Sequence, residues 1–212
     1  SGVVATDTTG VGTARDSLAA TGYGVGLAIF GYGNAGSVSS LTNKVSSSGV
    51  VASDTTGVGT ARQFPAAARY GTDKAIFAFG STNKANLVSN TGVVSADVSG
   101  VGTSKEYTAG AGYGGDKAIM GYGVTSGMTA VTNLINNLGV VGADVTGVGT
   151  ARHNLSAASY GGDKAIFGYG NNGSANVSMT NLVNNSGVVA ADVTGVGTAR
   201  AGLVAGEYST SA

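Results

Sequence analysis

One block of about fifteen residues occurs five times along this 212-residue chain, and it limits the fold more than any other feature. The first copy reads Ser-Gly-Val-Val-Ala-Thr-Asp-Thr-Thr-Gly-Val-Gly-Thr-Ala-Arg and ends at Arg15. The later copies end at Arg62, Lys105, Arg152 and Arg200, so successive ends are 47, 43, 47 and 48 residues apart. A period of this length is typical of solenoids, propellers and arrays, in which each unit packs against its neighbours. The chain is therefore predicted to form a single repeat domain.

A second constant block lies between the copies of the first. It reads Tyr-Gly-Gly-Asp-Lys-Ala-Ile-Phe-Gly-Tyr-Gly at 160–170 and returns, with small changes, at 23–33, 70–80 and 113–123. The last unit offers four extended segments, at 154–160, 164–169, 177–183 and 187–191, with Gly- and Asn-rich turns between them. Four strands in a unit of this length are typical of a propeller blade. We expect an all-β fold, a β-propeller of four-stranded blades.

The strand at 164–169 is predicted to be buried on both faces. One face carries Ala165, Phe167 and Tyr169, and the other carries Ile166 and Gly168. Neither face is polar, as expected for a sheet that lies between two neighbouring sheets.

Composition excludes several classes of protein. Glycine takes 38 positions but has no three-residue period and proline occurs once, which excludes collagen. Eleven cations balance eleven anions, so nucleic acid is not an expected partner. The chain has no cysteine, no apolar run long enough to cross a membrane and no visible signal peptide.

These blocks resemble the kelch-type β-propeller blade. In that family an arginine leads into a small-residue strand and then a hydrophobic strand that ends in glycines; 152–170 is similar to this half, and 181–200 is similar in spacing to the other. Gly-Tyr-Gly stands where the family has a double glycine, and the family's tryptophan is missing. The Gly-, Thr- and Asn-rich composition also resembles that of kelch-like arrays in structural and tail proteins of bacteriophages. The resemblance implies a β-propeller fold.

The repeat also predicts the units and leaves open how the array closes. Full units span 16–62, 63–105, 106–152 and 153–200, and a partial fifth unit is formed by 1–15 and 201–212. The chain can be a five-bladed ring closed by both ends, a segment of a longer array, or an open stack closed by another chain. Unpaired strand edges would favour multimers in the last two cases.

The first block supplies an aspartate and a cation in each copy. As a ligand site the carboxylates would form a ring of calcium or sugar sites. As structure, each aspartate would hold its own turn or pair with a cation of the block. One carboxylate per site favours the structural role, so no cofactor is expected and calcium is the alternative. The residues are Asp7, Asp54, Asp97, Asp144 and Asp192, with Arg15, Arg62, Lys105, Arg152 and Arg200.

Aromatic and amide side chains at the end of the second block are candidate ligand contacts. Aromatic rings beside glycines can stack on sugars, and amides match sugar hydroxyls; rings as core filler and amides in turns are the alternatives. The candidates are Tyr32, Phe79, Tyr122, Tyr169, Asn171 and Asn172. The Asp-Lys pairs at 73–74, 116–117 and 163–164 are either contacts at a rim or solvated turn tips.

Catalysis is not expected. His153 is the one histidine and stands at a position that varies between repeats, and Glu106 and Glu207 are the only glutamates. No nucleophile, base and orienting acid occur together, and copper ligands are lacking. We expect a non-enzymatic structural or binding propeller of a virion, such as a phage tail fibre, or of an extracellular surface, with a glycan or protein partner. The alternatives are a self-assembly module that uses open blade edges and, less favoured, a hydrolase or lyase that uses carboxylates.

Overall fold

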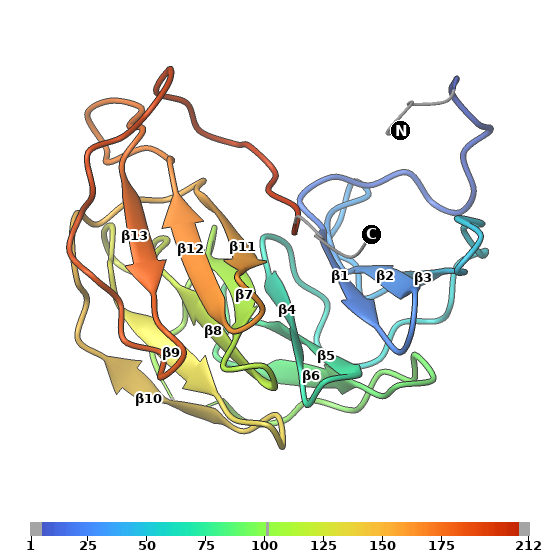
Figure 1. Cartoon of the computed structure of the whole chain (residues 1–212). Helices are drawn as coiled ribbons and strands as arrows, with labels where there is room; N and C mark the ends of the chain where they lie inside the picture. Colours follow the sequence, from blue (N-terminus) through green and yellow to red (C-terminus); the bar gives the residue numbers. More distant parts are fainter. Residues whose placement is uncertain (1–5, 101, 208–212) are drawn as a thin grey trace.

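The computed structural model describes residues 6–100 and 102–207, which form an all-β fold (Figure 1). Thirteen strands make four separate antiparallel sheets, and the described residues contain no helix. It follows that no apolar helix long enough to cross a membrane occurs in this part of the chain. Of the predicted fifth unit, residues 1–5 and 208–212 lie outside the described residues.

Each predicted unit contains one sheet whose strands follow chain order. The first sheet is β1 (Ala19–Tyr23), β2 (Leu27–Gly31) and β3 (Thr42–Val45); the second is β4 (Ala66–Tyr70), β5 (Lys74–Ala78) and β6 (Ala85–Val88). The third sheet is β7 (Ala109–Tyr113), β8 (Lys117–Gly121), β9 (Thr132–Ile135) and β10 (Val141–Val145). The fourth is β11 (Ser156–Tyr160), β12 (Lys164–Gly168) and β13 (Thr180–Val183).

The prediction of four strands per unit is correct only for the third sheet. In the other three units the fourth segment meets the third strand through isolated bridges, such as Thr180 with Val193 and Val183 with Val189. Between these two bridges the Ala190 N–H donates to the Leu182 carbonyl at 2.8 Å, and the Asn181 amide donates to the Ala190 carbonyl at 3.0 Å. The equivalent amide bond, from Asn133 to Gly142 at 3.0 Å, also occurs beside β10, so this bond does not explain why the fourth segment is a regular strand only in the third unit.

The sheets follow one another around a common centre, with their first strands innermost (Figure 1). The first strand of each sheet contacts the first strand of the next, from β1 to β4, β7 and β11. The turns that follow these strands are joined by backbone hydrogen bonds, from Gly24 to Asp73 and from Gly71 to Asp116 at 2.6 Å, and from Gly114 to Asp163 at 2.7 Å. The segment after β13 runs back across the middle towards the first sheet (Figure 1).

A hollow of about 280 Å³ lies between the first strands. Its wall takes a small residue from the same position of every unit, five residues after the cation of the first block. These residues are Ala20, Ala67, Gly110, Ala157 and Ala205. Ala205 follows the fourth unit, so the beginning of the fifth unit also lines this hollow.

The two-sided burial predicted for 164–169 is wrong for one face of β12: Ala165 and Phe167 are buried, but Ile166 and Gly168 are half-buried. Every residue after the leading lysine is buried in β5 and β8, on both faces. At the ends of the array one face opens: Phe30 of β2 is 37 % exposed, and Ile166 of β12 is half-buried. The two opened faces are opposite ones, because the Phe face packs on the preceding sheet and the Ile face on the following one.

Candidate functional site

A cation at the end of each unit covers an aromatic ring of the same unit. The guanidinium carbon of Arg62, which precedes β4, lies 3.9 Å from the ring centre of Tyr32, which follows β2. The same contact joins Arg152 to Tyr122 at 4.4 Å, and Lys105 to Phe79 at 4.6 Å. Arg200 lies over Tyr169 at 4.5 Å. Arg62 also donates to the Phe77 carbonyl of β5, and Arg152 to Asn181 of β13, so these two cations connect the sheet that precedes the ring to the sheet that follows.

Burial of the aromatic rings removes most of them from the candidate ligand contacts. Tyr32, Phe79 and Tyr122 are at most 1 % exposed, and a cation covers one face of each ring. Burial raises the pKa of Tyr32 to about 12, because the phenolate would lose its hydration. A ligand cannot reach these three rings. They fill the core, which is the alternative to ligand contact given by the sequence. Tyr169 is half-buried.

Each aspartate of the first block, from the second copy on, binds a turn of the preceding copy. The Asp192 carboxylate accepts bonds from the Thr150 N–H at 2.9 Å and the Thr150 hydroxyl at 2.7 Å. It also accepts a bond from the Asn181 amide at 2.9 Å and lies 3.9 Å from Arg152. The equivalent threonine holds Asp54, Asp97 and Asp144.

These bonds correct the prediction that each aspartate holds its own turn: the partner lies some forty residues earlier in the chain. The predicted pairing with a block cation does occur, at 3.5 Å between Asp54 and Arg15 and at 3.6 Å between Asp144 and Lys105. Asp97 pairs instead with Lys84 at 3.1 Å, and Asp7 lies exposed before β1.

N–H and O–H groups of the protein already donate hydrogen bonds to the aspartate oxygens that a calcium ion would need as ligands. Burial works against ionisation of Asp97, but the bonds from Thr60 and Asn86 outweigh it and hold the pKa of Asp97 well below its usual value. Among the described residues no three His, Asp or Glu side chains are grouped as metal ligands would be. The aspartates thus stabilise the junction between the third strand, the fourth segment and the block before it.

The candidate amides turn towards their own loop. Asn171 Oδ1 accepts from the Gly173 N–H at 2.7 Å, and Asn172 Oδ1 accepts from the Ala175 N–H at 2.9 Å. Both amides hold the loop that follows β12. The Asp-Lys pairs lie in the turns after the first strands: Lys117 Nζ is 3.0 Å from Asp116, and Lys164 Nζ is 2.8 Å from Asp163.

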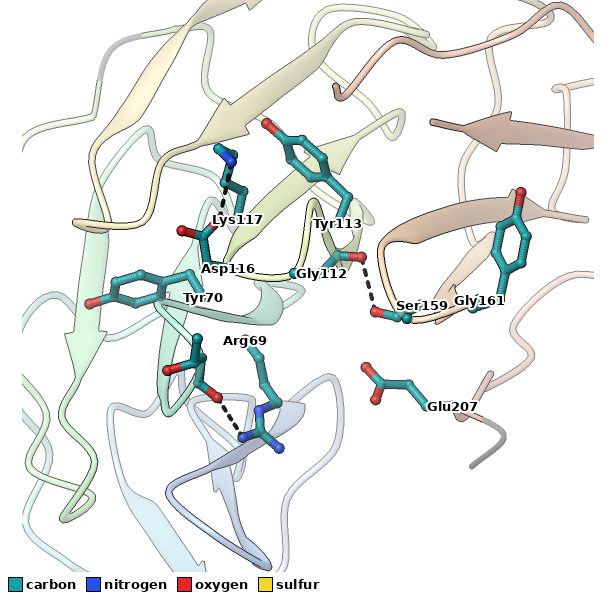
Figure 2. A pocket seen from close by; sticks show the side chains of 13 residues that line it. Arg69, Tyr70, Gly112, Tyr113, Asp116, Lys117, Ser159, Gly161 and Glu207 are labelled. Carbon is teal, nitrogen blue, oxygen red and sulfur yellow. Dashed lines mark hydrogen bonds and ion pairs between the residues drawn. The ribbon is translucent and has the colours of Figure 1, made fainter. Parts of the chain in front are cut away.

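A polar hollow of about 340 Å³ lies among the turns that follow the first strands, next to the hollow lined by small residues (Figure 2). Its non-repeated side chains come from a position seven residues after each block cation. That position holds Gly22, Arg69, Gly112, Ser159 and Glu207, so a cation, a hydroxyl and a carboxylate replace glycine in different units. Variation in charge at one position of a constant repeat is the signal that the sequence interpretation missed.

The side chains around this hollow differ in how they are held. Arg69 Nη2 donates to the carbonyls of Gly24 at 3.0 Å and Thr72 at 2.9 Å, which fixes the guanidinium beside the first turn. Ser159 donates to the Gly112 carbonyl at 3.0 Å, while Glu207 is exposed at the rim (Figure 2). Tyr160 is 37 % exposed beside them, whereas the equivalent Tyr113 is 4 % exposed. A fixed cation, a carboxylate and an aromatic ring thus surround one opening.

The sequence matches no model of a known protein family, and no curated protein matches it.

Proposed function

We propose that the chain is a non-enzymatic, kelch-like β-propeller scaffold that binds a glycan at the mouth of its middle, on a virion or an extracellular surface. The contacts between first strands and the hollow that they share support the propeller arrangement. Each four-stranded blade of that propeller would consist of three regular strands and a looser fourth segment, as in the first, second and fourth units.

One observation supports the binding site. The polar residues that recur in every unit form contacts within the scaffold, whereas the polar residues that differ between units lie around one opening. The block cations and aspartates bind rings, turns and each other. Arg69, Ser159 and Glu207 instead lie at the position that changes from unit to unit, with Tyr160 beside them. Hydroxyl groups of a sugar would be donors to the carboxylate and acceptors from the guanidinium, and the exposed ring would stack on the sugar's apolar face.

The alternative of assembly through open blade edges has less support. The outer edges of β3, β6 and β13 are bridged by the fourth segment of their own unit, so they are not free over their full length. A catalytic function has less support, because the Ser159 hydroxyl at the opening donates to the Gly112 carbonyl, and no bond from it to a carboxylate is seen among the described residues.

The test is a glycan array followed by titration of the best glycan against matched variants. Arg69→Ser places at the opening the residue that β11 has at the equivalent position, so the backbone should tolerate it. Lys44→Ser is the control, because it removes one cation from β3, away from the opening. We expect Arg69→Ser to weaken binding at least about tenfold, as for loss of a charged hydrogen bond, and Lys44→Ser to leave it unchanged.

Two results would contradict the proposal. If no glycan binds at millimolar concentration, only a structural or protein-binding role is left. If both variants bind as the parent chain does, the glycan site lies elsewhere.

A further inference from the structure

Two of the buried tyrosines sit in a socket with the same three parts: a cation and a valine carbonyl from the block that ends their own unit, and a phenylalanine of the next unit. For Tyr32, Arg62 covers the face at 3.9 Å, the Phe77 ring lies at 5.2 Å between centres, and the Val58 carbonyl accepts the phenol proton at 3.3 Å. Each part therefore recognises a different feature of a phenol: its face, its edge and its hydroxyl.

Tyr122 meets the same three parts two interfaces later. Arg152 covers its face at 4.4 Å, Phe167 lies at 5.0 Å, and its hydroxyl donates to Val148 at 3.0 Å. The socket is therefore a repeated device of the interface between units and not a single accident of packing.

The block that ends at Arg15 and the first unit together carry the same three parts, and no ring of the described residues lies between them. Arg15, Phe30 and Val11 stand at the positions equivalent to Arg62, Phe77 and Val58, and together they line a hollow of about 680 Å³. Phe30 is 37 % exposed, whereas Phe77 is fully buried.

The cation of this hollow is already in position. Arg15 Nε donates to the carbonyl of Tyr32 at 2.8 Å, and Nη2 donates to Asn43. Arg152, which covers a ring, makes the equivalent bonds to Tyr169 at 2.8 Å and to Asn181 at 2.6 Å. The guanidinium is thus oriented as it is where a ring lies against it.

The backbone around each buried ring restricts what could fill the hollow. Tyr32 and Tyr122 have positive φ, 65° and 60°, and the glycine that follows each has φ of 101°. The residue before the ring must be small, because a methyl group at Gly31 would lie 2.8 Å from Phe77 Cζ. A segment that reads small residue, aromatic residue and glycine at the end of an extended strand meets both conditions.

We infer that the hollow in front of Phe30 is a binding site for a tyrosine side chain, presented by an extended segment of another polypeptide that ends in Gly-Tyr-Gly. The partner strand would continue the interface that the chain already uses between its own units. The Arg15 face, the Phe30 edge and the Val11 carbonyl would hold its phenol.

The test uses a labelled peptide with the sequence of residues 164–185, titrated against the full chain by fluorescence anisotropy. It carries the Phe-Gly-Tyr-Gly end of β12. We expect saturable binding that falls at least about tenfold when its tyrosine is changed to alanine, through loss of the aromatic and cation contacts. A change of the tyrosine to phenylalanine should cost only a few-fold, because Phe79 occupies the equivalent position within the chain.

Variants of the chain test the hollow itself. Phe30→Ala should weaken binding of the peptide at least about tenfold. Leu182→Ala is the control and should leave binding unchanged, because Leu182 has nearly the same exposed fraction as Phe30, 39 % against 37 %, but lies at the opposite end of the array. Circular dichroism checks that both variants fold, and if Phe30→Ala does not fold, the peptide series decides alone.

Four outcomes would overturn the inference. They are no binding at millimolar peptide, equal binding of the tyrosine and alanine peptides, and binding of p-cresol without binding of the peptide. The fourth is dimerisation of the chain that Phe30→Ala abolishes while the peptide does not bind, since a second copy would then fill the hollow.

Discussion

Two phenylalanines at equivalent positions of successive units should differ in their contribution to the free energy of unfolding. Phe77 is fully buried, with Tyr32 of the preceding unit against its ring at 5.2 Å. Phe30 is 37 % exposed because no ring lies in front of it within the described residues. We therefore predict that Phe77→Ala destabilises the chain more than Phe30→Ala does.

The size of the difference follows from burial and from the cavity left behind. A fully buried phenylalanine costs about 3–5 kcal/mol on truncation to alanine, because the surrounding core cannot collapse completely. At Phe30 the transfer of the partly buried ring gives roughly 1–2 kcal/mol, and an open site leaves no closed cavity. The expected difference is about 2 kcal/mol or more.

Urea unfolding followed by circular dichroism measures this difference, provided that the slope of the transition is the same in both variants. Equal losses, within about 0.5 kcal/mol, would refute the reasoning. They would mean that the Phe face of β5 is not packed on the preceding sheet.

Three further predictions follow from close contacts and titrating groups. Gly31→Ala should destabilise the chain by about 1–3 kcal/mol because its methyl group meets the buried Phe77 ring; Gly127→Ala, with no atom within 4 Å, is the control, and equal unfolding midpoints would contradict this. Bonds that outweigh burial lower the pKa of Asp97, Asp144 and Asp192, so these groups stabilise the fold above their unfolded pKa, and that stability is lost as the pH falls. The thermal midpoint should therefore be flat above about pH 5 and drop below about pH 4, less steeply in Asp97→Asn; a midpoint that rises on acidification would be the opposite result. Because burial raises the pKa of Tyr32 to about 12 and also raises the pKa of Tyr122, the late part of the tyrosine ionisation should lose the amplitude of one tyrosine in Tyr32→Phe, and an unchanged absorbance titration would exclude that assignment.

The repeat predicted the all-β fold, because strand and turn residues recur at the same distances in every unit. Two-sided burial was predicted for 164–169, but β12 lies in the last sheet and is fully buried on one face only, whereas β5 and β8 in the middle sheets are buried on both. The irregular fourth segment was not predictable in this way. Its amino acids suit a strand in every unit, yet only the third unit has a regular fourth strand, and the equivalent bonds of Asn133 and Asn181 do not distinguish the two cases.

The partners of the aspartates and aromatic rings could not be predicted, because a repeat does not tell which copy touches which. Asp192 binds Thr150 of the preceding block, and Tyr32 meets Arg62 of the following one. One substitution pair does carry such information. Where β8 has Met120 in place of phenylalanine, the residue equivalent to Gly31 in the preceding unit is Ala78, and the two share one core cluster. A flexible side chain leaves room for the extra methyl group.

A crystal structure of the chain at a resolution that shows side chains tests the central proposal most directly. The account predicts β1, β4, β7 and β11 around one shared hollow, with the Arg62 and Arg152 guanidinium groups over the Tyr32 and Tyr122 rings. A map in which the sheets stack along a line, with β11 turned away from Ala205 and the rings facing solvent, would contradict it.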